Sequence, residues 1–492
     1  MNKEICQLIK YALGHHLITE DDVDFTVNSL LDLFHLEDFT KIDTEDAPLE
    51  EILSAMLDYA VNHGLCEDGT VSRDLFDTRI MGLLMPRPHE VIENFQKQYA
   101  ISPQAATSYY YDLSIASNYI RMPRIEKNIR FKKGTKYGPI EITINLSKPE
   151  KDPKAIAAAR LMKNSSYPQC LLCKENVGFA GDLRRPAREN HRIIPLSLAG
   201  DRYYMQYSPY VYYNEHCIVF NEKHVPMKVD HQTFVHLLDF ITQFPHYMLG
   251  SNADLPIVGG SILTHDHYQG GAYHFPIEDA KVMEVYQLKD CKAELLYWPL
   301  TTIRLTSASK ERLIALADKI LAKWIDYDDA DHDILSHTGE TRHNTITPIA
   351  RRRGDDYVLD LVLRNNRTTE EYPLGIFHPH AENHHIKKEN IGLIEVMGLA
   401  ILPARLKDEM NLLKDCLLGQ KNIDDYECLE KHKDWYQELS AQHITEENVD
   451  DVLRQGLTDV FTNVLENAGV YKMNDDGMAG FKKFVSYALE GE

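Results

Sequence analysis

Residues 254–271 read Asp254-Leu-Pro-Ile-Val-Gly-Gly-Ser-Ile-Leu-Thr-His-Asp-His-Tyr-Gln-Gly-Gly271 and place His265, His267 and Gln269 two residues apart. Successive side chains of a β-strand point to opposite faces, so a strand would present these three side chains on one face. A helix would spread them around its circumference. We therefore expect a β-strand that brings two imidazoles and an amide to one place.

The residue types in this strand indicate chemistry at phosphorus or a metal site. Neutral imidazole is both a nucleophile and a metal ligand, and a neighbouring amide can donate to a phosphoryl oxygen. Two glycine pairs, Gly259-Gly260 and Gly270-Gly271, flank the motif and remove side chains where phosphates or another backbone come close. The structural alternative is a buried strand with satisfied histidines.

This stretch resembles the signature of the class II branch of the galactose-1-phosphate uridylyltransferases almost residue for residue. The class I branch carries His-Pro-His-x-Gln at the same site, and its second histidine is the nucleophile. The resemblance implies that His267 is the nucleophile and that Gln269 binds the phosphoryl group. Ser261 and backbone N–H groups would donate to the charge that develops on the phosphoryl oxygens.

The same resemblance implies an α+β fold, in which two related halves of the histidine-triad type form an antiparallel sheet flanked by helices. It also implies a homodimeric enzyme of galactose catabolism that exchanges UMP between UDP-glucose and galactose 1-phosphate, giving glucose 1-phosphate and UDP-galactose. His267 would hold the uridylyl group as a phosphoramidate between two displacements, which splits one difficult step into two easier ones.

Two other functions stay open at this point. A histidine-triad nucleotide hydrolase or phosphorylase would use the same nucleotidyl-histidine but release it to water or phosphate. A noncatalytic, zinc-stabilised nucleotide-binding protein would use the strand histidines only for structure. The length of 492 residues favours the transferase, because a hydrolase of the histidine-triad group needs far less chain.

A second motif, Cys170-Leu-Leu-Cys173 followed by His224, has the spacing of metal ligands. In the class I branch, a structural zinc is bound by such a cysteine pair, by a later histidine and by the first histidine of the catalytic motif. The resemblance therefore assigns a structural zinc to Cys170, Cys173, His224 and His265. The alternative is a buried thiol pair without metal. Class I members carry a second metal, but its counterpart here, Leu361–Arg367, lacks histidines, so we expect no second metal.

The phosphates of a nucleotide sugar require cations, and the densest basic stretch near the cysteine pair is Arg184–Arg192. Within it, Arg188 and Arg192 are the candidate phosphate ligands, because a guanidinium can contact two phosphate oxygens at once. A solvated surface is the alternative for such a cluster. Asn252 falls near a position that contacts substrate phosphate in class I. Other arginines compete for the phosphate role: Arg351, Arg352, Arg353, Arg364 and Arg367.

Four histidines lie within residues 378–385, and His378-Pro-His380 matches the His-Pro-His sequence of the class I catalytic motif. Its context argues against catalysis, because Glu382 replaces the glutamine and no glycine pair flanks it. We expect a solvated loop here rather than a sugar site or an adventitious metal site.

Composition excludes several classes of protein. Lys and Arg total 53 against 75 Asp and Glu, and the net charge of −22 disfavours nonspecific binding to nucleic acid or anionic membranes. No apolar run reaches the roughly 18 residues of a membrane span, and the N-terminal residues lack an apolar targeting core. The eight cysteines are mostly isolated. We therefore expect a cytoplasmic enzyme with reduced thiols.

The patterns of apolar and polar residues divide the chain into four parts. Residues 1–131 are helical in pattern, 132–300 form the first catalytic half, 301–420 the second half, and 421–492 an acidic helical tail. Thr19-Glu-Asp-Asp22 has the spelling of a capping box and predicts the start of a helix. Further helices are expected over about 231–243, 310–325 and 388–406, and strands over 141–146, 210–213, 217–220 and 357–363.

Overall fold

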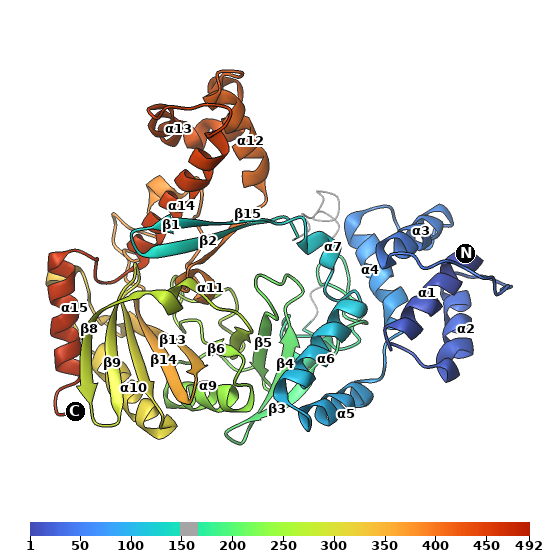
Figure 1. Cartoon of the computed structure of the whole chain (residues 1–492), viewed down its shortest axis with the longest axis horizontal. Helices are drawn as coiled ribbons and strands as arrows, with labels where there is room; N and C mark the ends of the chain where they lie inside the picture. The colour runs from blue at the N-terminus through green and yellow to red at the C-terminus, as the bar shows by residue number, and fades with distance from the viewer. Residues whose placement is uncertain (148–165) are drawn as a thin grey trace. The chain divides into compact units, whose positions relative to one another are not determined.

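The computed structural model describes residues 1–147 and 166–492, and the order of its helices and strands can be followed in Figure 1. The described chain forms two compact units, each assembled from segments that are distant in sequence. Unit 1 comprises Met1–Lys127, Ser147–Val211 and Glu215–Val225, and unit 2 comprises Asn128–Leu146, Tyr212–Asn214 and Pro226–Glu492. None of the helices in the described ranges combines the length and the apolar character needed to cross a membrane.

The N-terminal part of unit 1 is helical, as predicted. Its helices are α1 (Asn2–Gly14), α2 (Val23–Leu33), α3 (Leu49–Asn62), α4 (Thr70–Gly82), α5 (Pro88–Tyr99), α6 (Pro103–Ala116) and α7 (Met122–Ile125). The capping box predicted before α2 is present, and the Thr19 backbone N–H donates to Asp22 Oδ2 at 2.9 Å. Val27 and Leu30 of α2, and Phe34 directly after it, are buried as the apolar stripe requires.

The described residues of unit 1 also form three antiparallel strands. They are β3 (Ile194–Leu198), β4 (Asp201–Tyr207) and β5 (Cys217–Asn221), and they pair in chain order. The buried Tyr110 of α6 connects this helix to the chain segment before β3, because its hydroxyl donates to the backbone carbonyl of Arg192 at 2.5 Å. This contact also fixes the backbone of the basic stretch that precedes β3.

Unit 2 is built on a sheet with the strand order β7-β6-β13-β14-β10-β9-β8, in which every neighbouring pair is antiparallel. The strands are β6 (Met248–Gly250), β7 (His267–Gly271), β8 (Lys281–Leu288), β9 (Cys291–Tyr297), β10 (Thr302–Ser307), β13 (Asn344–Arg353) and β14 (Asp356–Asn365). Helices α9 (His231–Gln243) and α10 (Lys310–Ile325) pack against β13 (Figure 1). Both helices match their predicted bounds residue for residue.

The element order three strands, one helix, two strands occurs twice along the chain. The first set is β3, β4, β5, α9, β6 and β7; the second is β8, β9, β10, α10, β13 and β14, with a short hairpin of β11 (His337–Thr338) and β12 (Thr341–Arg342) inserted. In both sets the first strand pairs with the second, the second with the third, and the fourth with the fifth. Strands β6 and β13 pair and join the two sets within unit 2. The predicted α+β class, with antiparallel sheets and flanking helices, is confirmed.

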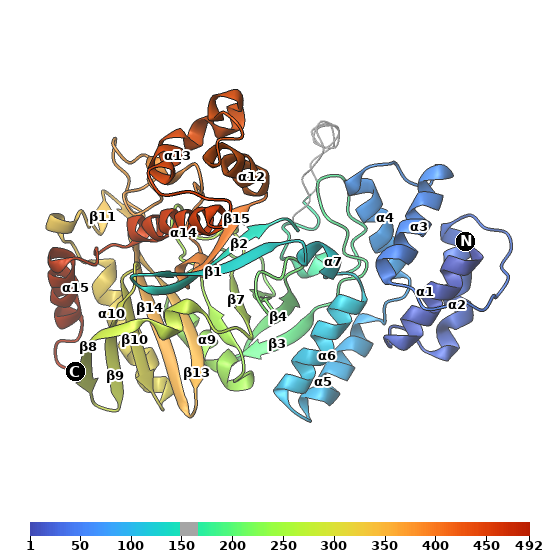
Figure 2. The same ribbon diagram turned by 45° about the horizontal axis from the view of Figure 1, so that its top comes forward.

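A second sheet of unit 2 pairs β2 (Gly138–Asn145) antiparallel with β1 (Ile129–Thr135) and parallel with β15 (Leu399–Pro403). Helix α14 (Val449–Ala468) runs along this sheet, and α15 (Asp475–Ala488) lies beside α10 (Figure 2). Helices α12 (Arg405–Leu417) and α13 (Lys433–Ser440) pack against α14. Leu453 and Leu457 of α14 share one apolar core with Ile142 of β2. The tail is therefore helical, as predicted, and is stabilised by burial against the second sheet.

Two predicted elements are wrong. Residues 210–213 form turns instead of a strand, and Val211 has a φ of +40°, which lies outside the β region. The helix expected over 388–406 is replaced by α11 (Leu393–Val396), β15 and the start of α12. Gly398 interrupts this stretch with a φ of +95°, which a right-handed helix does not allow.

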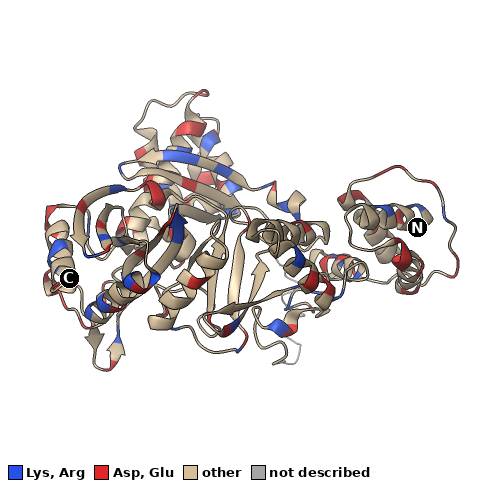
Figure 3. Cartoon of the chain, turned by 60° about the horizontal axis from the view of Figure 1, so that its bottom comes forward, with Lys and Arg blue, Asp and Glu red and all other residues tan. Residues whose placement is uncertain are grey.

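Charged residues of both signs are interspersed along both units (Figure 3). Near β1, Lys136 Nζ lies 2.6 Å from Glu466 Oε1, and Lys133 forms an ion pair with Asp451. Exposed pairs of this kind contribute about 0–1 kcal/mol each. Both pairs join the β1–β2 hairpin to α14, so they add to the apolar contact between these elements.

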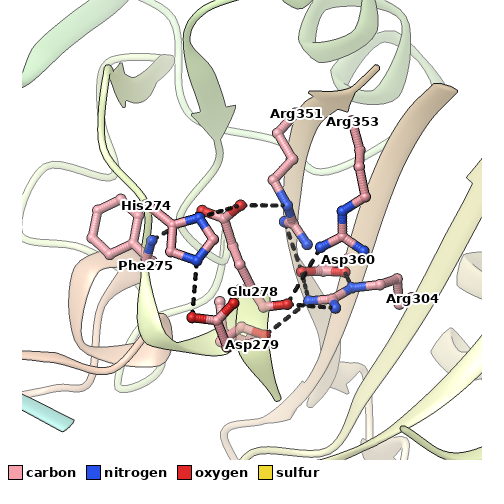
Figure 4. A network of polar contacts seen from close by, with 9 residues as sticks. His274, Phe275, Glu278, Asp279, Arg304, Arg351, Arg353 and Asp360 are labelled. Atoms are coloured by element: carbon pink, nitrogen blue, oxygen red, sulfur yellow. Dashed lines mark hydrogen bonds and ion pairs between the residues drawn. The ribbon is translucent and has the colours of Figure 1, made fainter. Parts of the chain in front are cut away.

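A buried ion-pair network ties the 3₁₀ turn η3 (Pro276–Asp279) to the main sheet of unit 2 (Figure 4). Asp360 of β14 is fully buried; its Oδ1 lies 2.7 Å from Arg304 Nε and its Oδ2 lies 2.8 Å from Arg351 Nη1. Arg304 Nη1 also donates to the Glu278 carbonyl at 3.1 Å, and Arg351 Nε lies 3.1 Å from Glu278 Oε2. Burial opposes ionisation of Asp360, but the two guanidinium groups outweigh it and hold its pKa at about 2.

Candidate active site

Strand β7 presents the central part of the predicted motif. His267 is its first residue and Gln269 its third, so both side chains point to one face of the main sheet. The expectation that His265 alternates with them on the strand is wrong, because His265 lies in a bend before β7. Strand β6 pairs with β7 as far as Gly250, which lies opposite Gln269. Strand β7 begins at His267, so His265 lies two residues outside it.

The imidazole of His267 is held in one tautomer. Its Nδ1 lies 2.8 Å from the backbone carbonyl oxygen of His265, which can only accept, so Nδ1 carries the proton. The lone pair then resides on Nε2. Burial lowers the pKa of His267, so the ring is neutral at pH 7. A neutral, oriented imidazole with its lone pair on Nε2 is the form that attacks phosphorus.

The glycine pair Gly259-Gly260 lets the loop before β7 pack against its own start. A Cβ at Gly259 would lie 2.6 Å from the backbone oxygens of Ala253 and Leu255, and a Cβ at Gly260 would lie 2.7 Å from Asn252 Nδ2. Both positions must therefore be glycine, because other parts of the chain lie so close to them. The sequence indicated two reasons for the glycine pair, close approach of phosphates or of another backbone, and the structure shows close approach within the chain. Ser261 follows them and is exposed.

Asn252 lies two residues after β6 and is 3% exposed. Its Oδ1 accepts a hydrogen bond from the backbone N–H of Leu393 at 2.9 Å, which identifies the carbonyl end of the amide. Nδ2 therefore faces Gly260, in the loop that carries Ser261 and leads to His267. The side chain thus directs two N–H donors toward this loop.

Sequence reasoning missed the role of Asp254, the first residue of the motif stretch. Its carboxylate accepts hydrogen bonds from the Val229 backbone N–H at 3.1 Å, from Arg342 at 2.7 Å and from the Thr345 hydroxyl at 2.6 Å. These bonds anchor the start of the loop to the segment before α9 and to β13. An aspartate at the start of a glycine-rich loop was the signal that could have indicated such an anchor.

Unit 1 brings together the cysteine pair and His224. The sulfur atoms of Cys170 and Cys173 lie 3.5 Å apart, and Cys173 Sγ lies 3.3 Å from His224 Nδ1. The Asn176 amide shapes the Cys-x-x-Cys turn, because it donates to the carbonyls of Cys170 at 2.8 Å and Cys173 at 2.7 Å. The three ligand atoms lie within 4.8 Å of one another.

The chemistry of these donors fits a metal ion. Burial raises the pKa of the Cys173 thiol to about 11, so a thiolate there needs a nearby cation. Two sulfurs and an imidazole nitrogen are the ligands that zinc prefers in structural sites. The cluster can therefore hold a metal ion. His265, the fourth residue that the sequence assigns to the metal, belongs to unit 2.

The two candidate phosphate ligands of unit 1 differ in their surroundings. Arg192 is buried and donates to three backbone carbonyls, from Nε to Pro86 O at 2.8 Å and from Nη1 to Glu189 O at 3.0 Å and His191 O at 2.8 Å. Burial lowers the pKa of Arg192 to about 10. Arg188 instead lies over the ring of Tyr119, 5.3 Å from its centroid, and makes a long hydrogen bond of 3.4 Å to Ala187 O.

The histidine-rich segment 378–385 is not a solvated loop, and that expectation is wrong. His378 is 4% exposed, and burial lowers its pKa. The ring nitrogens contact protein groups: His378 contacts Asn390, His380 the Ile376 carbonyl, His384 the Pro379 carbonyl and His385 the ring of His432. These contacts give the segment a structural role that its polar composition did not indicate.

The chain shows a distant structural similarity to yeast Ap4A phosphorylase Apa2, with a TM-score of 0.32 and 13% identity. The alignment covers 65% of this chain and 92% of that chain.

Sequence comparisons are far more specific. Residues 17–226 match the family described as galactose-1-phosphate uridyl transferase, N-terminal domain, and residues 240–437 match its C-terminal domain. A galactose-1-phosphate uridylyltransferase of Clostridium acetobutylicum is 54% identical over 494 residues, which cover 99% of each chain. Another, from Caldanaerobacter subterraneus subsp. tengcongensis, is 51% identical over 98% of this chain and 97% of that one. The chain therefore belongs to the galactose-1-phosphate uridylyltransferase family.

Proposed function

We propose that this enzyme exchanges UMP between UDP-glucose and galactose 1-phosphate through a uridylyl-histidine formed on His267. Identity of about half over the full length of relatives with this activity supports the overall reaction. The observation that carries the mechanism is the 2.8 Å contact from His267 Nδ1 to the His265 carbonyl, because it leaves the lone pair on Nε2.

In the first displacement, His267 Nε2 attacks the α-phosphorus of UDP-glucose. The bond from this phosphorus to the bridging oxygen breaks, and glucose 1-phosphate leaves with the electron pair. The uridylylated ring carries a positive charge, and its Nδ1–H still donates to the His265 carbonyl. A hydrogen bond from a charged donor is stronger than one from a neutral donor, so this contact stabilises the intermediate.

In the second displacement, a phosphate oxygen of galactose 1-phosphate attacks the same phosphorus. The P–N bond breaks, its electrons return to Nε2, and UDP-galactose leaves. We propose that Gln269, Ser261 and the Nδ2 of Asn252 donate to the phosphoryl oxygens, where charge develops in both steps. Arg188 is our candidate for binding the substrate phosphate from unit 1. Arg192 stays a weaker candidate, because its Nε and Nη1 already donate to backbone carbonyls.

We also propose a structural zinc bound by Cys170, Cys173, His224 and His265. Two thiolates and two imidazoles are a closed tetrahedral set. When bound, the metal would restrain His265, whose carbonyl accepts the Nδ1–H of His267. The zinc would thereby act on the orientation of the nucleophile without contacting the substrate.

The zinc proposal predicts a loss of stability in Cys173→Ser. Removing one ligand weakens metal binding, and metal binding contributes to folding, so the melting temperature should fall by about 4 °C or more. Turnover at low temperature should fall less. Cys428→Ser, at an exposed cysteine, is the matched control and should melt like the wild type. A wild-type protein that contains no zinc and melts at the same temperature with and without chelator would rule the metal out.

The proposed reaction is tested by product analysis. The protein is incubated with UDP-glucose alone and with UDP-glucose plus galactose 1-phosphate, and nucleotides are separated by ion-exchange chromatography. UDP-galactose should accumulate over many turnovers only when both substrates are present, and initial-rate plots should be parallel, as a double displacement requires. Steady release of UMP without acceptor would indicate a hydrolase instead. A cytoplasmic homodimer remains part of the proposal, and sedimentation equilibrium tests the dimer.

A further inference from the structure

We propose that Arg364 is a positioning residue for uridylyl transfer, because it holds the segment Ile391–Leu393 that orients the Asn252 amide. This inference rests on the proposed function, and specifically on Asn252 Nδ2 as a donor to a phosphoryl oxygen. Arg364 would not contact the substrate. Its effect would pass from the Ile391 carbonyl, which it holds, to the Leu393 N–H, and from there to the side-chain amide of Asn252.

The register of the sheet places Arg364 on the face that carries the motif. Gln269 of β7 is opposite Gly250 of β6, and Gly250 is opposite Ile349 of β13. Thr345 lies four residues before Ile349, and Arg364 of β14 is opposite Thr345. Opposite residues of antiparallel strands share a face, as do residues four apart in one strand. Arg364 and Gln269 therefore extend from the same side of the sheet.

Arg364 is a buried cation that forms no close ion pair in the described parts of the chain. It is 1% exposed, and burial lowers its pKa to about 10. Its Nη2 donates to the Ile391 carbonyl at 2.9 Å and its Nη1 to the Thr347 hydroxyl at 3.4 Å, whereas its Nε is buried without a hydrogen-bond partner. An apolar side chain of similar length would avoid the desolvation cost of this charge. Stability alone therefore does not explain an arginine at this position.

The segment held by Arg364 contacts the candidate active site two residues later. The Leu393 backbone N–H donates to Asn252 Oδ1 at 2.9 Å. The Leu393 side chain packs on β6, where a Cβ at Gly250 would lie 2.8 Å from Leu393 Cδ1. Between them, the Gly392 backbone N–H donates to Glu395 Oε2 at 3.2 Å. The segment is thus fixed at three successive residues, and its last residue determines which end of the Asn252 amide faces Gly260.

Without Arg364, the Ile391 carbonyl loses its hydrogen-bond donor. Leu393 is then held less firmly, because the segment two residues before it is no longer fixed. We expect Asn252 to sample orientations in which Nδ2 no longer faces the loop. A displacement of about 1 Å in a group that positions a reacting phosphorus costs on the order of 100-fold in rate. The effect should therefore appear in the chemical step rather than in folding.

The experiment measures the single-turnover rate of uridylyl-enzyme formation at saturating UDP-glucose. Arg364→Met should slow this step by about 10- to 100-fold, while its melting temperature should change by less than about 4 °C. Arg364→Lys should recover part of the rate, because an ammonium group can still donate to the Ile391 carbonyl. Arg312→Met removes an arginine of α10 that pairs with Glu492, and this control should keep the wild-type rate.

A double-mutant cycle tests whether Arg364 acts through Asn252. Asn252→Ala should itself slow uridylylation, and adding Arg364→Met in that background should cause no further loss. Losses that multiply would overturn the proposal, because Arg364 would then act by another route. A wild-type rate in Arg364→Met would overturn it as well.

Gly392→Ala tests the same link without altering Arg364. A Cβ at Gly392 would lie 3.2 Å from Asn252 Oδ1, and the φ of −89° at this residue is open to alanine. This variant should also slow uridylylation, with no further loss in the Asn252→Ala background. A wild-type rate in Gly392→Ala would contradict the proposal even if Arg364→Met failed to fold. An unmodified wild-type enzyme after mixing with UDP-glucose would instead refute the proposed function, and the inference with it.

Discussion

Replacing His267 with alanine should abolish uridylyl transfer, with a loss of about 10⁴-fold or more in turnover. Removal of a covalent nucleophile eliminates the intermediate, and effects of this order or larger are typical. The fold should persist, because His267 begins β7 and alanine retains its backbone pairing. The measurement is the rate of UDP-galactose formation, with circular dichroism and the melting temperature as checks of folding.

His380→Ala is the matched control for this variant, because His378-Pro-His380 has the class I spelling of the catalytic pair. The Nε2 of His380 donates to the Ile376 carbonyl at 2.9 Å, and its ring stacks on Tyr372 with the centroids 4.5 Å apart, so these contacts hold the ring within its own segment. His380→Ala should therefore retain turnover. Retained transfer in His267→Ala, or its loss only in His380→Ala, would place the nucleophile elsewhere than on β7.

Replacing Asp360 with asparagine should destabilise unit 2 by about 3–5 kcal/mol, the usual cost of breaking a buried ion pair. Asparagine fits the site but leaves the charges of Arg304 and Arg351 without their shared carboxylate (Figure 4). The pKa of Asp360 is depressed from 3.8 to about 2, so its stabilising effect is complete above pH 4 and is lost as the pH falls toward 2. Thermal melting at pH 7 and pH 3 measures both effects.

Asp279→Asn is the control within the same network. Asp279 is 65% exposed and lies 2.9 Å from the exposed ring of His274, so its loss should cost less than about 1 kcal/mol. Equal melting temperatures for the Asp360 and Asp279 variants would show that the buried pairs do not stabilise the packing of η3. A loss confined to Asp360→Asn supports the role of the network as an anchor for the turn that follows β7.

Local patterns predicted the elements whose boundaries are set by their own residues. Helix α9 begins where Asp230 Oδ1 accepts from the Gln232 backbone N–H at 3.0 Å, and α10 begins where Ser309 Oγ accepts from the Arg312 backbone N–H at 3.2 Å. Caps and apolar periodicity are local signals, so a single sequence contains them. The same holds for the alternation of His267 and Gln269 on β7.

Tertiary contacts decided the features that the sequence did not predict. The amide of Asn252 is oriented by Leu393, 141 residues later, and no local pattern joins the two positions. The phosphate role of Arg192 stays a prediction, but its Nε and Nη1 donate to backbone carbonyls that no local pattern identifies. His265 lies two residues before β7, which begins at His267. In each case, the outcome depends on which distant backbone groups lie nearby.

Intact-mass analysis after mixing with UDP-glucose alone tests the central claim most directly. The account predicts a mass increase of one uridylyl group, located on His267 by peptide mapping, that disappears when galactose 1-phosphate is added. An enzyme that forms UDP-galactose without ever carrying this adduct, or that carries it on another residue, would contradict the double displacement through His267.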